Sequence, residues 1–424
     1  MQSKPMSLKP ITLLWLAVAL SAGLFGCSTV NERSAAIPNI KGAETSISKI
    51  HMLDTKNGWA QTDGPEGLRV LRTTNGGQAW MDVTPRSVPC KIWDCEFPKS
   101  QTAWISYYDR NTCLLLTTNG GKSWVPWMPL GVLSNDTHNY FLVVRDCRFF
   151  SANNGLVETI DYGLGSAVYN FFETHDGGMI WKAAPIIPPE GPYADQPLGT
   201  IQISSPGSSY YGGGISYYPP GSVFIVDGDF IDGKPAGTVH LSFSANLGNS
   251  WRDLRLPLPD KYRDWWAGPS PPFFSNARNG LLPVSVFKQN TNGCHAEGVL
   301  IFYGTSDGGN TWTPRPGIVK CGSDYVGNYR QLDTVSAKDI FVRGGTNLYV
   351  THDGAKNWQT IKPNIDFERI SSHGGVAQID FVDATHGWAV LYDTFDHFLH
   401  SKYYLYKTLD GGATWLELPL RIVR

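Results

Sequence analysis

TSDGGNTW, from Thr305 to Trp312, is one of seven copies of the pattern Ser/Thr-x-Asp/Asn-Gly-Gly-x-x-Trp in this chain of 424 residues. Each copy is a box. The other six boxes are TTNGGQAW (Thr73 to Trp80), TTNGGKSW (Thr117 to Trp124), THDGGMIW (Thr174 to Trp181), SANLGNSW (Ser244 to Trp251), THDGAKNW (Thr351 to Trp358) and TLDGGATW (Thr408 to Trp415). The repetition predicts seven equivalent turns.

The residue types of a box suit a tight turn between two strands. The Asp or Asn side chain bonds nearby backbone, glycine supplies a positive φ, and the closing Trp anchors the next strand in the core. Leu247 replaces the first glycine of one box and Ala355 the second glycine of another, so we expect these two turns to be the most altered. We assign structural roles to Asn75, Trp80, Asn119, Trp124, Asp176, Trp181, Asn246, Trp251, Asp307, Trp312, Asp353, Trp358, Asp410 and Trp415.

The spacing of the boxes predicts the architecture. Successive boxes lie between about 44 and about 70 residues apart, the length of a four-stranded propeller blade with variable loops. Most boxes follow a strand, a polar turn and a second apolar strand, as in KIHMLDTKNGWAQT (Lys49 to Thr62). We therefore predict an all-β, seven-bladed β-propeller of four-stranded antiparallel blades. The expected blades are Ser46 to Pro85, Arg86 to Leu130, Tyr140 to Ile187, Leu198 to Pro259, Pro271 to Pro316, Asn328 to Pro363 and Gly375 to Arg424. Blade 7 retains all four strands, so the ring needs no borrowed N-terminal strand.

The boxes resemble Asp-box repeats, also called BNR repeats. Among proteins with this repeat, the chain most resembles the photosystem II stability and assembly factor family, in which a basic patch is thought to hold a membrane-protein partner. Sialidases, xyloglucan-specific glycoside hydrolases and sortilin-type ectodomains share the box. The resemblance implies a propeller, but it is poorly specific for function because one fold serves many activities.

The N-terminus reads as a lipoprotein signal. Lys4 and Lys9 precede an apolar run, and Leu24-Phe25-Gly26-Cys27 resembles a bacterial lipobox. We expect a signal peptide over 1–27 with lipidation of Cys27, a tether over 28–45 and a single propeller domain over 46–424, placed in the cell envelope outside the cytoplasm. A plain secretory peptide or a short membrane anchor is the alternative.

Six cysteines remain after Cys27, an even number in a chain expected to be exported. Box turns join third to fourth strands, so second-to-third-strand loops and blade-to-blade loops share the opposite end of the ring. Cys294 and Cys321 both fall there, and we expect them to pair. Cys90 with Cys113 and Cys95 with Cys147 is a weaker expectation, because equivalent inner strands of neighbouring blades may lie too far apart for a disulfide. Buried thiols are the alternative.

The same loop end carries the long insertions and the candidate binding residues. Tyr210, Tyr211, Tyr217 and Tyr218 lie among glycines and prolines, and Trp265 and Trp266 lie between blades 4 and 5. Exposed aromatic rings suit sugar stacking or protein recognition, although these rings could instead cover a blade edge. Arg110, Arg330 and Arg343 are expected on this end or its rim, where an ordinary solvated surface is the competing interpretation.

Acidic residues give little support for catalysis. A glycosidase needs two carboxylates about 5 to 9 Å apart, and so many acids fall on the loop end that one such pair is expected by chance. Ser46 to Asp54, at the start of the first blade, contains no arginine, so the arginine motif that sialidases carry near that blade is missing, and the chain is too short for two propellers. Asp396 with His397 and His400 could in principle bind a metal, but loop hydrogen bonding explains this cluster more simply. We expect no cofactor and no metal.

These features favour a non-enzymatic, lipid-anchored propeller that binds a protein partner, in the assembly or stabilisation of an envelope or membrane complex. The alternative is a glycan-binding or sialidase-type propeller that acts on extracellular carbohydrate. A formal net charge of −2 with no basic face argues against nucleic-acid binding.

Overall fold

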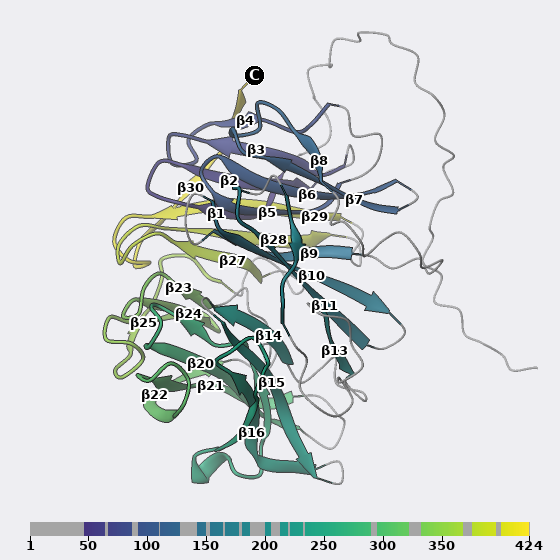
Figure 1. Ribbon diagram of the computed structural model, residues 1–424. Coiled ribbons are helices and arrows are strands. Elements are labelled where there is room, and N and C mark those ends of the chain that lie inside the picture. The colour runs from purple at the N-terminus through teal and green to yellow at the C-terminus, as the bar shows by residue number, and fades with distance from the viewer. Residues whose placement is uncertain are drawn as a thin grey trace, which may run out of the picture. The chain divides into compact units, whose positions relative to one another are not determined.

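The strands of this protein form seven antiparallel sheets, one for each box (Figure 1). The computed structural model describes residues 46–63, 67–86, 92–109, 111–127, 142–149, 153–163, 166–177, 180–186, 200–204, 213–218, 221–231, 234–289, 295–321, 332–367, 375–395 and 400–423. Within these ranges the only helix is a short 3-10 turn, η1 (Asp260–Tyr262), and no helix could cross a membrane. The predicted all-β, seven-bladed β-propeller is confirmed.

The first three blades each consist of four consecutive strands. Their bounds are β1 (Ser46–Met52), β2 (Gly58–Asp63), β3 (Arg69–Thr73) and β4 (Trp80–Asp82); β5 (Ile92–Lys99), β6 (Thr102–Asp109), β7 (Asn111–Thr117) and β8 (Val125–Trp127); and β9 (Leu142–Phe149), β10 (Gly155–Gly163), β11 (Ser166–Thr174) and β12 (Lys182–Ala183).

The remaining four blades follow the same order along the chain. Blade 4 is β14 (Gly213–Tyr218), β15 (Ser222–Ile231), β16 (Lys234–Ser244) and β17 (Arg252–Pro257); blade 5 is β18 (Trp266–Pro269), β19 (Phe273–Phe274), β20 (Gly280–Gln289), β21 (His295–Thr305) and β22 (Thr313–Cys321); blade 6 is β23 (Leu332–Thr334), β24 (Ile340–Gly344), β25 (Asn347–Thr351) and β26 (Gln359–Ile361); blade 7 is β27 (Gly375–Phe381), β28 (Gly387–Phe395), β29 (His400–Thr408) and β30 (Trp415–Leu418).

Four predicted blade edges differ from the structure, one of them because β22 continues to Cys321, beyond the expected end of blade 5 at Pro316. A short strand, β13 (Thr200–Ser204), pairs with β11 and so belongs to blade 3 rather than blade 4. Blade 5 begins earlier than predicted, because its first strand is divided into β18 and β19, which both pair with β20. The C-terminal strand β31 (Ile422–Val423) leaves blade 7 and adds to blade 1, in parallel with β4.

The ring closes between blades 7 and 1. Blade 7 has its four consecutive strands, as expected, and needs no borrowed N-terminal strand. On the outside, β31 pairs with β4, beside which the C-terminus lies in Figure 1. On the inside, the first strands β1 and β27 contact each other. Blades 7 and 1 are therefore neighbours in the ring although they lie at opposite ends of the propeller sequence.

The core lies between blades, where the box Trp residues pack on the preceding blade. Trp80 is fully buried among blade 7 residues that include Trp388 and Val390, and Trp415 packs with Phe341 and Leu348 of blade 6. Trp124, Trp251 and Trp358 are half-buried at the same position of their boxes. The closing Trp residues therefore pack between blades, with burial that differs from blade to blade.

Candidate functional site

The box turns share one set of hydrogen bonds. In every box the backbone N–H of the seventh residue donates to the Asp or Asn side chain, over 2.8 to 3.0 Å. In every box the fourth residue also donates its N–H to a carbonyl in the loop between the first and second strands, over 2.8 to 3.1 Å. Both kinds of turn therefore lie at one end of the ring, the box end, and their polar groups are bonded to each other.

The two irregular boxes keep these bonds, so the expectation that they would be the most altered was wrong. Leu247 adopts a φ of 58° and Ala355 a φ of 65°, in the left-handed region that glycine occupies elsewhere. Leu247 still donates to the carbonyl of Gly221 at 2.9 Å, and Ala355 still donates to the Thr351 hydroxyl at 3.2 Å. The side-chain hydrogen bonds outweigh the backbone strain.

Acids of the box end are occupied by turn hydrogen bonds. The hydroxyl and backbone N–H of Thr311 lower the pKa of Asp307 to about 2. Burial raises the pKa of Asp383, but the backbone N–H groups of Thr385 and His386 outweigh it and bring that pKa to about 2. These carboxylates are ionised hydrogen-bond acceptors at neutral pH, which suits turn fixation and does not suit a general acid.

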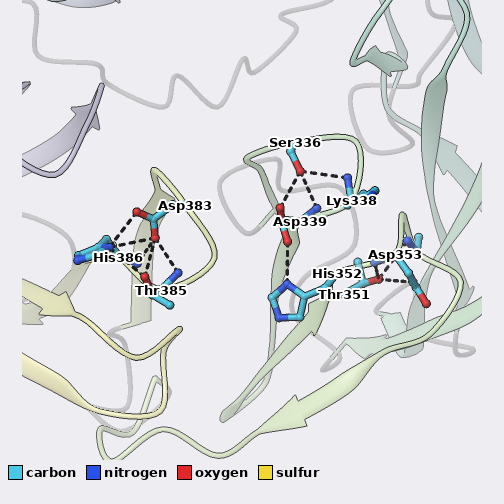
Figure 2. Close-up of polar contacts among 10 residues, drawn as sticks. Ser336, Lys338, Asp339, Thr351, His352, Asp353, Asp383, Thr385 and His386 are labelled. Carbon is cyan, nitrogen blue, oxygen red and sulfur yellow. Dashed lines mark hydrogen bonds and ion pairs between the residues drawn. The ribbon is translucent and has the colours of Figure 1, made fainter.

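Histidines join this network in blades 6 and 7, as Figure 2 shows. Nδ1 of His352 lies 2.7 Å from Oδ1 of Asp339, and Nδ1 of His386 lies 2.8 Å from Oδ2 of Asp383. Ser336 donates its hydroxyl to Asp339 at 2.8 Å. The serine hydroxyl is bonded to the carboxylate and not to the imidazole, so this group lacks the serine–histidine hydrogen bond of a nucleophilic triad. It ties a first-to-second-strand loop to a box.

The first strands carry a second network, which joins neighbouring blades near the axis of the ring. Gln378 of blade 7 bonds both the N–H and the carbonyl of Ile50 in blade 1, at 3.0 and 2.6 Å. Asp380 accepts the N–H of Met52. Asp333 of blade 6 likewise accepts the N–H of Phe381 in blade 7. Side chains of one inner strand therefore hold the backbone of the next.

Asp333 is the most strongly perturbed acid in this inner network. Burial raises the pKa of Asp333 to about 7, and the carboxylate of Asp380 adds to the rise. His51 lies on the other side of Asp380, with Nδ1 at 3.7 Å from Oδ1. No group of three metal-binding side chains occurs among the residues described. Asp333 and Asp380 therefore each accept a backbone N–H from the next blade, and the two carboxylates lie close enough to influence each other's charge.

Two of the four predicted loop tyrosines are structural. Tyr217 and Tyr218 lie in β14, the first strand of blade 4, and both are half-buried. Tyr217 packs on the core between blades 3 and 4, while Tyr218 packs on the core between blades 4 and 5 and donates its hydroxyl to the carbonyl of Pro272 at 2.6 Å. Tyr210 and Tyr211 lie outside the described residues.

Three further candidates are also structural. Trp265 packs against the core of blades 4 and 5 and lies edge-on to Tyr262, with ring centroids 5.0 Å apart. Trp266 begins β18 and is half-buried. Arg343, expected at the rim, is fully buried in β24 and donates to the carbonyl of Gly345 at 3.3 Å. Arg110, Arg330 and Asp396 lie outside the described residues.

One expected disulfide is not formed. Cys95 lies in β5 as a thiol with 1% exposure, packed among Trp59 and Val70 of blade 1. Its side chain faces away from blade 3, which contains Cys147, so the pairing of Cys95 with Cys147 was wrong. Cys90 and Cys294 lie outside the described residues, and the pairs of Cys90 with Cys113 and of Cys294 with Cys321 stay predictions.

The end of the ring opposite the boxes is built differently. Second-to-third-strand connections and blade-to-blade connections meet there, and their lengths vary. β6 and β7 are separated by one residue, β8 ends at Trp127 and β9 begins at Leu142, and β12 ends at Ala183 and β13 begins at Thr200. We call this end the loop end.

Sequence analysis missed a set of exposed apolar side chains on the outside of the ring. They are Leu409 and Leu416 of blade 7, Met81 of blade 1, Val125 of blade 2, Ile180 of blade 3 and Ile422 of β31. The signal was present, because the residue after the box Trp is apolar in blades 7, 1 and 2 and polar in blades 3 to 6.

Comparison with known proteins finds similar solved structures only at low sequence identity. No protein-family model and no curated protein sequence matches the chain. Similar solved structures include YCF48 bound to D1 peptide (16% identity over 83% of this chain and 94% of the other, TM-score 0.43) and YCF48 from Cyanidioschyzon merolae (15%, 89% and 97%, 0.45). A polysaccharide lyase of family PL25, an ulvan lyase, is also similar, at 8% identity over 89% of this chain and 96% of the other, with a TM-score of 0.47.

Proposed function

We propose that this protein is a lipid-anchored, extracytoplasmic propeller that binds a protein partner through its loop end. The observation that carries the proposal is the difference between the two ends of the ring. At the box end, acids and hydroxyls form hydrogen bonds within the turns themselves. The loop end, in contrast, has connections of unequal length on a rigid scaffold. Binding residues in proteins concentrate on such loops.

The partner is proposed to belong to a membrane or envelope complex that this protein helps to assemble or stabilise. Lipidation of Cys27 would hold the ring close to such a complex, which raises the effective concentration of the two partners. Arg110, Arg330 and Asp396 supply charge of both signs in the loop-end connections, and Tyr210 and Tyr211 supply aromatic rings. Such mixed surfaces recognise proteins through a few aromatic or arginine contacts.

Affinity capture of the anchored chain tests this proposal. The tagged protein is cross-linked in intact cells, recovered from the membrane fraction, and compared with the Cys27→Ala variant. We expect one membrane or envelope protein in stoichiometric amount with the natural chain, and much less with Cys27→Ala because the tether is lost. Recovery of no protein, from a preparation that binds or cleaves polysaccharides on a glycan array, would contradict the proposal in favour of the carbohydrate-active alternative.

A further inference from the structure

The residue that follows the box Trp offers a comparison at one position around the whole ring. It begins or adjoins the outermost strand and is exposed in all seven blades. Blades 3 to 6 place polar residues there: Lys182, Arg252, Thr313 and Gln359. Blades 7, 1 and 2 place Leu416, Met81 and Val125 there, with exposed fractions of 63%, 51% and 54%. One side of the circumference is therefore apolar.

Neighbouring side chains extend this stretch. Leu409 in the box of blade 7 is 58% exposed, and Ile180 in the box of blade 3 is 55% exposed. Ile422, in the strand that covers the edge of blade 1, is also exposed. Leu416, Ile422, Met81 and Val125 together form the apolar rim, and Leu409 and Ile180 border it at the box end. Single exposed apolar residues are common, but among the residues that the structure describes the large exposed apolar side chains fall on four consecutive blades, and such clustering is typical of an interaction surface.

The blades that carry the apolar rim are neighbours in the ring and pack against each other. Blades 7 and 1 share a core cluster that contains Trp80 and Trp388, and blades 1 and 2 share one that contains Trp59 and Phe97. Trp104 of blade 2 and Trp181 of blade 3 meet edge to face, with centroids 5.6 Å apart. The apolar rim is thus presented by a rigid support rather than by a mobile segment.

The start of the propeller indicates what covers this surface. The chain enters the ring at Ser46 in β1, the inner strand of blade 1, and blade 1 lies between blades 7 and 2, which also carry the apolar rim on their outer strands. The preceding tether, Ser28 to Thr45, has 18 residues. It can extend over at most about 60 Å and has a root-mean-square span of about 24 Å if flexible. A bilayer that holds Cys27 is therefore within reach of this side of the ring.

Charge near the apolar rim is compatible with a bilayer. Lys122 lies in the box of blade 2, Lys182 follows the box of blade 3, and Arg421 precedes Ile422, and all three are exposed. Basic side chains beside apolar ones are typical of proteins that lie on anionic lipid. Of the nearby acids, Asp82 is bonded to Arg69 at 3.2 Å and Asp410 to its own box, while Glu417, next to Leu416, is exposed.

We propose that the apolar rim rests on the bilayer surface, so that the ring stands edge-on to the membrane. This proposal uses the lipid anchor of the proposed function but does not depend on the protein partner. Edge-on docking leaves both ends of the ring open, and it directs the loop end sideways along the membrane. A partner embedded in the same bilayer would then face the loop-end connections directly.

Photo-cross-linking from the anchored full chain tests the docking. Benzoylphenylalanine replaces Leu416, Met81 or Val125 in separate variants, and Thr313 or Gln359, at the same position of blades 5 and 6, in matched controls. After irradiation of the membranes, adducts are identified by mass. We expect at least fivefold more lipid adduct from the apolar rim than from the controls. We also expect the double substitution Leu416→Glu with Met81→Glu to reduce the lipid adduct formed at position 125.

Three results would overturn the proposal. Protein adducts at the rim positions would make the rim a protein-binding surface, and equal lipid adducts at rim and control positions would mean that the ring has no preferred orientation. A chain absent from the membrane fraction before irradiation would remove the anchor on which the proposal rests. Failure to find a partner in the capture experiment would leave lipid adducts unchanged, so the two proposals fail separately.

Discussion

The box end and the loop end of this ring are made by the same strands but follow different rules. At the box end the third strand reaches the fourth through a turn of constant form, as in Thr117 to Val125 and Thr351 to Gln359. At the loop end, blade 2 connects to blade 3 across the residues between Trp127 and Leu142. The difference teaches that the repeat specifies the ring, and the connections that do not repeat are where we propose that recognition occurs.

The largest expected effect on stability comes from removing a box Trp. Trp80 is fully buried between blades 7 and 1, so Trp80→Ala should lower the free energy of unfolding by about 3 to 5 kcal/mol through the cavity that it leaves. Denaturant unfolding measures the change. Arg330→Ala at the loop end is the control, with an expected effect within about 0.5 kcal/mol. Equal losses in both variants would mean that the box end does not hold the ring.

A smaller loss is expected where glycine is required by space. Gly309 has a φ of 94°, and a Cβ at this position would lie 2.5 Å from Cε1 of Phe224. Gly309→Ala should therefore cost about 2 to 3 kcal/mol, from backbone strain and from displacement of the Phe224 ring. The shift of the urea midpoint gives the value. A variant as stable as the natural chain would show that this box turn can relax around the added methyl group, as we expect of a loop-end connection.

The inner strands make a prediction that depends on pH. Burial raises the pKa of Asp333 to about 7, above the unfolded value of about 4, so the folded state binds this proton more tightly. Its contribution to stability is present below pH 4 and is lost as pH rises toward 7. Asp333→Asn should therefore match the natural chain near pH 4 and exceed it near pH 8, measured by unfolding at each pH. A stability difference that does not change with pH would contradict the raised pKa.

The smallest effect is expected at a box that already departs from the pattern. Ala355 holds a φ of 65° at a position where five other boxes have glycine with a positive φ. Ala355→Gly should relieve this strain and raise the free energy of unfolding by up to about 1 kcal/mol, offset in part by the lost methyl group. A thermal unfolding midpoint below that of the natural chain would show that the buried methyl matters more than the strain.

Particular residues show which parts of the fold and of the candidate site could be predicted from the sequence. The position of each box turn could be predicted, because the same turn-forming residues recur seven times at blade-length spacing. Tyr217, Tyr218 and Arg343 were misplaced, because glycine, proline or charge hid strands whose side chains are packed by neighbouring blades. The proximity of Asp333 and Asp380 could not be predicted from sequence, because the two residues lie in different blades and each bonds the backbone of the next blade. The apolar rim needed only an alignment of the residue after each box Trp.

The central claim, that the loop end rather than the box end binds the partner, is tested most directly by matched charge reversals. Arg110→Glu with Arg330→Glu changes two basic residues of the loop end, and Lys338→Glu with Lys356→Glu changes two exposed basic residues of the box end. Partner recovered per molecule of anchored chain is measured for both variants. We predict a loss of at least tenfold for the loop-end variant and less than a twofold change for the box-end variant. The reverse order, or equal losses, would contradict the assignment of binding to the loop end.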